Sequence, residues 1–300
     1  MKRFAAVLAL LMILLLIPVP PVGTVINSIG DMLHAPLFAC LSLALFRLLH
    51  QRWSKSVSIT AAISWILASA VAALPELLQL LTGRTPSSQD LFADICGVSI
   101  GVFVAIAVAS PQRRRRVTFL LAAAIVLAIA ISRPVSILID VARQHSEFPV
   151  LGSFERTSET SRWTAKESQI QRVSEHATSG NWSLQVDLHP GIYPGTSLPH
   201  LPADWSEFDE LTTDIWLDGS EPLRIVVKVT DRSHNNEHED RFQRGFVLKP
   251  GANHLRIPLG DIQNAPLHRQ LELQRVATLS YFTVRLASPR TLFLDNVYLR

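Results

Sequence analysis

The sequence predicts a multi-domain protein, in which an all-α transmembrane bundle of about five helices precedes an all-β sandwich of the jelly-roll kind. Two observations predict this division. Residues up to about 139 form long apolar runs separated by short basic loops, whereas residues from about 150 onward are polar, aromatic and rich in turns. We therefore assign residues 1–145 to a membrane domain, 146–152 to a linker and 153–300 to the sandwich.

Five apolar stretches approach the roughly 20 residues that a helix needs to span a bilayer. They cover about 4–20, 32–50, 57–81, 90–110 and 117–139. The first follows Met1-Lys2-Arg3 as in a signal peptide, but it leads into Pro18-Val-Pro-Pro21 with no small-x-small cleavage site. We expect it to be an uncleaved first helix.

The basic residues of the short loops predict the topology, because such loops stay in the cytoplasm. Three basic groups fall on one side of the predicted bundle, at Lys2–Arg3, Arg47–Lys55 and Arg113–Arg116. The loops of the other side carry only Arg84. This pattern predicts a cytoplasmic N-terminus and an extracytoplasmic sandwich, and it accounts for the Arg113–Arg116 run without a nucleic-acid partner.

Polar clusters interrupt the apolar segments at nearly one depth, close to the predicted outer face. They are Asp31 with His34, Glu76 with Gln79, Arg84, and Asp90 with Asp94. Each pair is spaced i,i+3 or i,i+4 and therefore shares a helix face. An ionisable group at mid-bilayer costs at least ~2.5 kcal/mol, so such groups usually line an internal site. We predict a ligand site here, with helix capping as the alternative interpretation of Asp31 and Asp90.

Acids dominate this constellation, since four carboxyl groups accompany one permanent cation and one histidine. Crowded carboxylates in a low dielectric raise one another's pKa or recruit a cation, so protonation, a metal or a cationic ligand group would balance them. The predicted fourth helix continues its acidic face with Gly97-x-x-x-Gly101, a spacing that predicts close approach of a neighbouring helix.

Asp31-x-x-His34 with Phe38, Glu76-x-x-Gln79, Gly83-Arg84, Asp90-Leu91 and Gly97-x-x-x-Gly101 together resemble the VanZ-like membrane proteins over about residues 25–110. That family is named for a protein linked to low-level teicoplanin resistance. The resemblance implies a multi-pass protein of the bacterial inner membrane that is connected with the cell envelope. Met32 stands where the family often has Lys, and Asp94 where it often has Asn, so this site is more acidic than the family pattern.

The second half alternates apolar and polar residues in short runs, as half-buried strands do. The clearest predicted strands cover 182–188, 211–217, 223–230, 254–259 and 292–299. Turn signals such as Asp218-Gly219 and Pro250-Gly251 separate them. About 150 residues of this kind fit one antiparallel sandwich or jelly roll.

The order of landmarks along this half resembles carbohydrate-binding modules with a galactose-binding-like jelly-roll fold. These landmarks are Phe154-Glu155, the segment 174–184, Tyr193-Pro-Gly195, Asp204-Trp205, Asp231 and Leu294-Asp295-Asn296. The resemblance implies a saccharide partner and a structural Ca²⁺ held in part by Glu155 and Asp295, because Ca²⁺ takes hard oxygen ligands.

Aromatic rings are the expected sugar contacts, and five are candidates: Trp163, Trp182, Tyr193, Trp205 and Trp216. Trp182 and Trp216 lie within strand patterns, which favours the core. Tyr193 and Trp205 lie in loop-like segments and are the carbohydrate-binding candidates. The i,i+4 pair His234 and His238 belongs to a stretch that we expect to be a solvated hairpin loop rather than a metal site.

Three functions fit these features. The first is an envelope protein that binds or handles a lipid or lipid-linked glycan headgroup at the outer membrane face, while its sandwich binds a saccharide or an envelope protein. The second is an intramembrane transferase or hydrolase with Glu76 or Asp94 as general base and His34 as acid. The third is a membrane anchor for a protein-interaction sandwich. No nucleophile elbow, phosphate-binding glycine loop or paired Cys motif is present, so catalytic residues stay unassigned.

Overall fold

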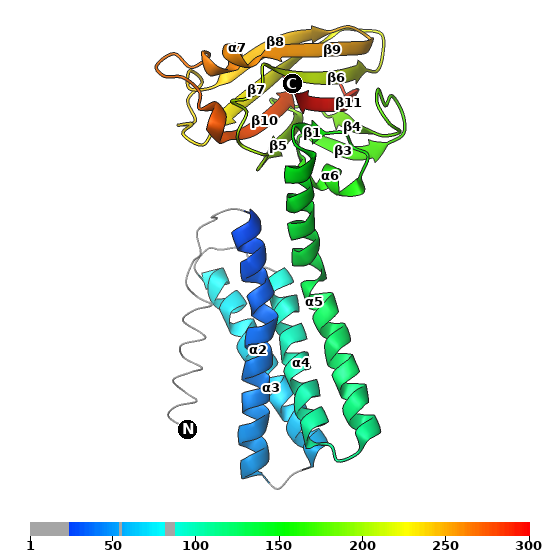
Figure 1. Cartoon of the computed structure of the whole chain (residues 1–300), viewed down its shortest axis with the longest axis vertical. Coiled ribbons are helices and arrows are strands. Elements are labelled where there is room, and N and C mark those ends of the chain that lie inside the picture. The colour runs from blue at the N-terminus through cyan, green and yellow to red at the C-terminus, as the bar shows by residue number, and fades with distance from the viewer. Residues whose placement is uncertain (1–23, 54–55, 82–87) are drawn as a thin grey trace. The chain divides into compact units, whose positions relative to one another are not determined.

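The computed structural model of the protein describes residues 24–53, 56–81 and 88–300, without the side chains of 24, 25, 27 and 75–81. The chain divides into two compact units, Met1–Ile139 and Asp140–Arg300, which are described separately. Figure 1 shows the first as helices and the second as mostly strands. The predicted order of an all-α part followed by an all-β part is therefore confirmed.

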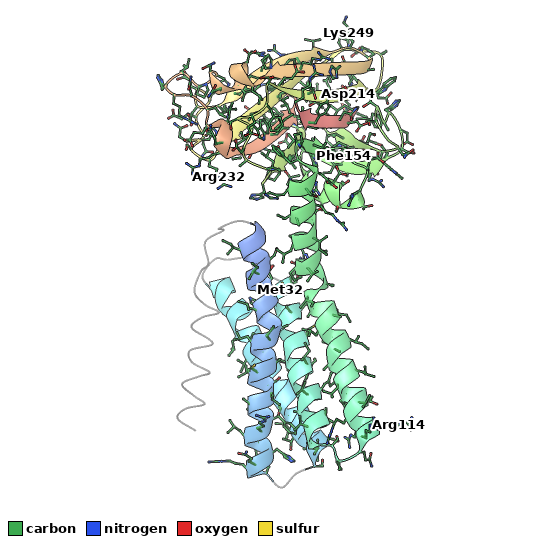
Figure 2. All side chains as sticks on the ribbon, viewed as in Figure 1. Met32, Arg114, Phe154, Asp214, Arg232 and Lys249 are labelled. Atoms are coloured by element: carbon green, nitrogen blue, oxygen red, sulfur yellow. The ribbon has the colours of Figure 1, made fainter. Side chains whose placement is uncertain are left out.

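Four helices of the described residues are long and apolar enough to cross a membrane. They are α2 (Thr24–Arg52), α3 (Val57–Leu81), α4 (Ser88–Ala109) and α5 (Arg113–Glu147). They match the last four apolar stretches of the sequence, and the expected helix at 4–20 lies outside the described residues. Figure 2 shows Arg114 and Met32 toward opposite ends of this unit.

The glycines of α4 lie directly against the backbone of α2, as their spacing predicted. A Cβ atom on Gly97 would lie 2.3 Å from the carbonyl oxygen of Ala35, and one on Gly101 would lie 2.2 Å from that of Ala39. Only glycine permits this approach. Phe38, with Leu41, Ala68, Ala72 and Val98, forms a buried cluster contributed by α2, α3 and α4.

The second unit is built from two antiparallel sheets. One has the order β3-β4-β11-β6-β9, with β1 also paired to β11, and the other has the order β2-β5-β10-β7-β8. The strands of the first sheet are β1 (Val150–Gly152), β3 (Ser168–Val173), β4 (Ser183–Leu188), β6 (Glu210–Leu217), β9 (Gly251–Pro258) and β11 (Arg290–Leu299). Those of the second are β2 (Thr164–Lys166), β5 (Gly195–Pro199), β7 (Leu223–Asp231), β8 (Phe242–Leu248) and β10 (Val276–Phe282).

Short helical turns complete the unit: α6 (Thr157–Arg162), α7 (Leu259–Gln263) and the 3-10 turn η1 (Leu273–Arg275). The residues expected to form a linker, 146–152, instead comprise the end of α5 and strand β1. Arg162 fastens the end of α5 to α6, since its guanidinium donates to both carboxylate oxygens of Asp140 at 2.8 and 2.9 Å.

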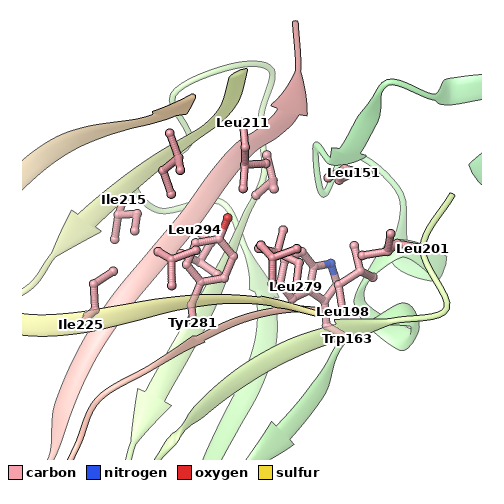
Figure 3. Close-up of a cluster of buried hydrophobic side chains, with 14 of the residues drawn as sticks. Leu151, Trp163, Leu198, Leu201, Leu211, Ile215, Ile225, Leu279, Tyr281 and Leu294 are labelled. Carbon is pink, nitrogen blue, oxygen red and sulfur yellow. The ribbon is translucent and has the colours of Figure 1, made fainter. Parts of the chain in front are cut away.

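The two sheets enclose one apolar core. Figure 3 shows Leu279 and Tyr281 of β10 among the side chains of the other sheet, including Ile215 and Leu294. The phenol of Tyr281 is buried and shares a hydrogen bond of 2.5 Å with Thr213. Because successive residues of a strand point to opposite faces, this core fixes which residues of the second sheet point outward.

Candidate functional sites

The outer face of the second sheet carries a cavity of about 500 Å³. Strand register places four polar residues side by side across it: Ser197 of β5 pairs with Ser280 of β10, Ser280 with Lys228 of β7, and Lys228 with Gln243 of β8. Their strand neighbours, such as Val227 and Leu279, are buried in the core. The polar row therefore faces away from the core, and all four of its members line the cavity.

Two aromatic rings lie at the same cavity. Tyr193 is 48 % exposed, and its ring meets that of Phe282 edge-on with centroids 6.0 Å apart. The ammonium group of Lys166 lies 5.7 Å from the Tyr193 ring centroid. Glu167 holds the segment in place, because its carboxylate accepts a hydrogen bond of 2.9 Å from the backbone N–H of Tyr193. The structure thus brings one of the two expected sugar-binding rings to a cavity.

Several polar groups of the cavity have no partner among the described residues. In the described part of the chain, the side chains of Lys166, Lys228 and Arg241 make no hydrogen bond and no ion pair, and Lys166 contacts only the Tyr193 ring. The Nε atom of Arg241 and the Oε1 atom of Gln243 are buried without a hydrogen-bond partner. Buried polar atoms are normally paired with protein or water, so these groups are available to a ligand.

The positive charges at the cavity repel one another. Burial lowers the pKa of Lys228, and the positive charges of Arg241 and Lys166 lower it further. Each of these effects disfavours the charged form of the Lys228 side chain. An anion would remove the repulsion among the three.

The loop between β7 and β8 delivers Arg241 and His238 to the cavity. Arg269 fixes this loop through a fork, in which its guanidinium donates to both carboxylate oxygens of Asp231 at 2.5 and 2.8 Å and also to Asp240. Asp240 accepts a hydrogen bond of 2.9 Å from the backbone N–H of Asn235. The stretch is a hairpin loop as expected, since it joins the two paired strands β7 and β8.

The prediction that Trp205 contacts a sugar is wrong, because its side chain is buried. Trp205 is 0 % exposed, and its indole N–H donates to the carbonyl of Pro202 at 3.0 Å, so neither face of its ring is free for a sugar. Burying the large apolar ring of Trp205 is favourable, which accounts for its place in the core. The reverse holds for two rings expected in the core. Trp182 and Trp216 are half-buried outside it, under Arg172 and His176.

The carboxylates expected at a calcium site hold a loop directly. Glu155 accepts hydrogen bonds from the backbone N–H groups of Asn181 and Trp182, at 2.8 and 3.0 Å. Asp295 accepts from those of Thr178 and Ser179, at 2.7 and 3.0 Å. No group of three or more His, Cys, Asp or Glu in the described part of the chain is placed to hold a metal. Backbone N–H donors use Oε1 of Glu155 and both carboxylate oxygens of Asp295. The two residues therefore hold the loop in this structure, and calcium binding by them stays a prediction.

The helical unit brings together two of the polar clusters that interrupt its apolar segments. Nδ1 of His34 on α2 lies 2.8 Å from Oδ1 of Asp94 on α4, and Asp94 is 3 % exposed. Asp31 and Asp90 line a cavity of about 440 Å³, which Arg133 of α5 also lines. The side chains of Glu76 and Gln79, and all of Arg84, lie outside the described residues.

Arg133 was missed as a site residue, although the sequence holds a signal for it. It is the only charged residue between Val117 and Ile139, in the stretch predicted to be the last spanning helix. A lone cation in such a segment is usually turned toward a protein interior or a polar cavity. The structure places it accordingly, at the cavity that Asp31 and Asp90 line.

No family model and no curated protein matches the chain. Solved structures with partial likeness include the family 11 carbohydrate-binding module from Clostridium thermocellum in complex with a beta-1,3-1,4-mixed-linked tetrasaccharide, with 16 % identity, a TM-score of 0.41, and coverage of 50 % of this chain and 93 % of that one. An exo-beta-agarase is 19 % identical with a TM-score of 0.41, covering 50 % and 24 %. The CBM22-1 xylan-binding domain of Paenibacillus barcinonensis Xyn10C is 20 % identical with a TM-score of 0.37, covering 50 % and 93 %. The two-sheet fold itself rests on the strand pairing of this chain.

Proposed function

We propose that this protein is a membrane-anchored saccharide-binding protein that binds its glycan on the outer face of the second sheet. The observation that carries the proposal is the cavity in which the Tyr193 and Phe282 rings adjoin the outward polar row. Ring surfaces suit the apolar faces of pyranoses, and hydroxyl and amide side chains suit sugar hydroxyls.

The helical unit acts as the anchor in this proposal. Four helices meet the length and apolarity that a span requires. The basic loop residues support an N-terminus in the cytoplasm and a sandwich outside it. The VanZ-like motifs support the inner membrane of a bacterium as the location.

A glycan microarray probed with the full chain in detergent micelles tests the proposal. Tyr193→Ala removes a cavity ring and should weaken binding about three- to tenfold, the equivalent of roughly 0.5 to 1.5 kcal/mol for one ring contact. Ile192→Ala is the matched control, because Ile192 is the exposed neighbour of Tyr193 and does not line the cavity. Absence of any glycan binding, or equal binding by the two variants, would refute the proposal.

A second candidate function belongs to the helical unit, which we propose binds a lipid or lipid-linked glycan headgroup. The cavity lined by Asp31, Asp90 and Arg133 favours it, because a headgroup that carries phosphate and ammonium or hydroxyl groups would find partners of both kinds. Native mass spectrometry should show a lipid retained by wild type and by the exposed-residue control Arg114→Met, but lost from Arg133→Met. Equal lipid profiles would contradict it.

Asp94→Asn separates headgroup binding from the intramembrane enzyme of the sequence analysis. The substitution keeps the size of the side chain and its hydrogen bonding, but it removes the base. An enzyme would then retain its lipid and lose turnover. A simple anchor for a protein-interaction sandwich would show neither effect.

A further inference from the structure

We infer that the sandwich cavity selects acidic saccharides, meaning glycans that carry a carboxylate, sulfate or phosphate group. This inference rests on the proposed function and names the ligand class of the same site. Three features carry it: the positive charges of the residues that line the cavity, the absence of acids from that lining, and the planar guanidinium of Arg241.

Positive charge is concentrated at the cavity and acids are missing from its lining. Lys228 occupies the middle of the polar row, and Lys166 and Arg241 line the same space. No Asp or Glu is among the lining residues, all of which lie in the described part of the chain. Glu167 is the sequence neighbour of Lys166, but its carboxylate is turned to backbone N–H of Tyr193.

Two acids of the adjoining loop form ion pairs away from the cavity, and the other two, Glu237 and Glu239, are exposed and do not line it. Asp231 and Asp240 both accept hydrogen bonds from Arg269, so they do not offset the charge of Lys228. Glu239 lies 3.9 Å from His268 and is exposed to solvent. The cavity therefore keeps a surplus of cations, which the row of hydroxyl and amide groups does not compensate.

The consequence for ligand choice is energetic. A neutral sugar seated over the half-buried Lys228 would remove water from the ammonium group without supplying a counter-charge, and such desolvation is unfavourable. An anionic group in the same position would make charge-assisted hydrogen bonds, which are about twice as strong as neutral ones. The site thus favours an acidic sugar over its neutral counterpart.

Arg241 narrows the chemistry further. Its Nε atom is buried and has no hydrogen-bond partner in the described part of the chain. A guanidinium donates through a planar fork that matches the paired oxygens of carboxylate, sulfate and phosphate groups. The atom that lacks a partner is one member of that fork.

Binding of the full chain in detergent to matched pairs of glycans tests the inference. The panel pairs oligogalacturonates with their carboxyl-reduced forms, and sulfated or phosphorylated galactans and mannans with the unmodified polymers. We expect each bound acidic glycan to bind about tenfold or more tightly than its neutral partner. The three kinds of pair distinguish carboxylate, sulfate and phosphate as the recognised group.

Two cavity variants and one control complete the test. Lys228→Met keeps the length of the side chain and removes its charge, so it should reduce the acidic-to-neutral preference about tenfold. Arg241→Met should reduce it as well, which gives a second readout if either variant unfolds. Lys249→Met is the control, since Lys249 is exposed in the turn between β8 and β9 and Figure 2 shows it at the margin of the sandwich.

The possible results separate the two proposals. Equal binding of acidic and neutral partners, unchanged by Lys228→Met, would overturn the preference for acids and leave saccharide binding intact. Binding to no member of the panel would overturn both. A preference for acids that Lys249→Met reduces as much as Lys228→Met would place recognition in general surface charge and overturn the cavity as its source.

Discussion

Arg269 is the residue whose loss should most clearly reveal how the loop beside the cavity is held. The carboxylate of Asp231 is fully buried, and Arg269 contacts both of its oxygens. Arg269→Met would leave that carboxylate with only the backbone N–H groups of Glu272 and Ser233, at 2.8 and 3.2 Å. Removing one partner of a buried ion pair costs about 3 to 5 kcal/mol.

For Arg269→Met we expect a loss of stability at the lower end of this range, about 3 kcal/mol. Arg269 is itself 27 % exposed, and two backbone donors to Asp231 remain. For a unit of this size, a loss of about 3 kcal/mol lowers the Tm by roughly 6 to 12 °C. Thermal unfolding of the full chain in detergent, followed by near-ultraviolet circular dichroism, measures this change. The matched control is Arg275→Met, because the pair of Arg275 with Glu272 is exposed and contributes about 1 kcal/mol or less. Equal shifts in the two variants would refute the reasoning.

Acid provides an independent readout of the same pair. Burial would raise the pKa of Asp231, but hydrogen bonds from Arg269 and the backbone lower it by more, so the folded pKa lies below its usual value. The carboxylate therefore stabilises the fold above its unfolded pKa of about 3.9. That contribution is lost as the pH falls through the lower folded pKa. The difference in Tm between wild type and Arg269→Met should consequently narrow below about pH 4, and a constant difference would contradict this assignment.

Three further predictions concern the helix packing of the first unit and the sandwich loop that Glu155 and Asp295 hold. Gly101→Val should disrupt the folded helices, because a Cβ atom at this position would meet the backbone of Ala39. Gly30→Ala is the control and should not disrupt them, since nothing lies within 4 Å of a Cβ atom there. Size-exclusion chromatography in detergent compares the two variants. Asp295→Ala should lower the stability of the sandwich by about 2 to 4 kcal/mol, because the backbone N–H groups of Thr178, Ser179 and Asn296 lose their acceptor. A calcium chelator should leave the wild-type Tm unchanged, and a drop on chelation would show that a metal holds the loop.

The helices and the clearest strands could be predicted because each has a strong pattern of its own. The third apolar stretch, 57–81, coincides with α3, and 223–230 falls within β7. Strand β5 was missed because its five residues, Gly195–Pro199, hold one large apolar side chain and no clear alternation. Its place in the sheet comes from pairing with β10, a contact between distant parts of the sequence.

Site residues were harder to predict, since sites join side chains from different elements. Tyr193 was chosen as a candidate because of its place in a loop, whereas the polar row came from the register of four strands. Nothing in the sequence around Lys228 indicates a site residue, because an outward lysine in a strand usually faces solvent. Trp205 shows the converse, since a loop position does not indicate whether the loop itself folds inward.

If the proposed saccharide binding holds, the direction of the polar row predicts how long the bound glycan should be. The row crosses β5, β10, β7 and β8 at one level, and neighbouring strands lie about 4.8 Å apart. That spacing is close to the length that one sugar residue adds to an extended glycan. A chain laid along the row would set successive residues over successive strands, so affinity should rise with oligosaccharide length until the four strands are covered. On the proposed function, this surface would bind the interior of a polymer regardless of where the polymer ends.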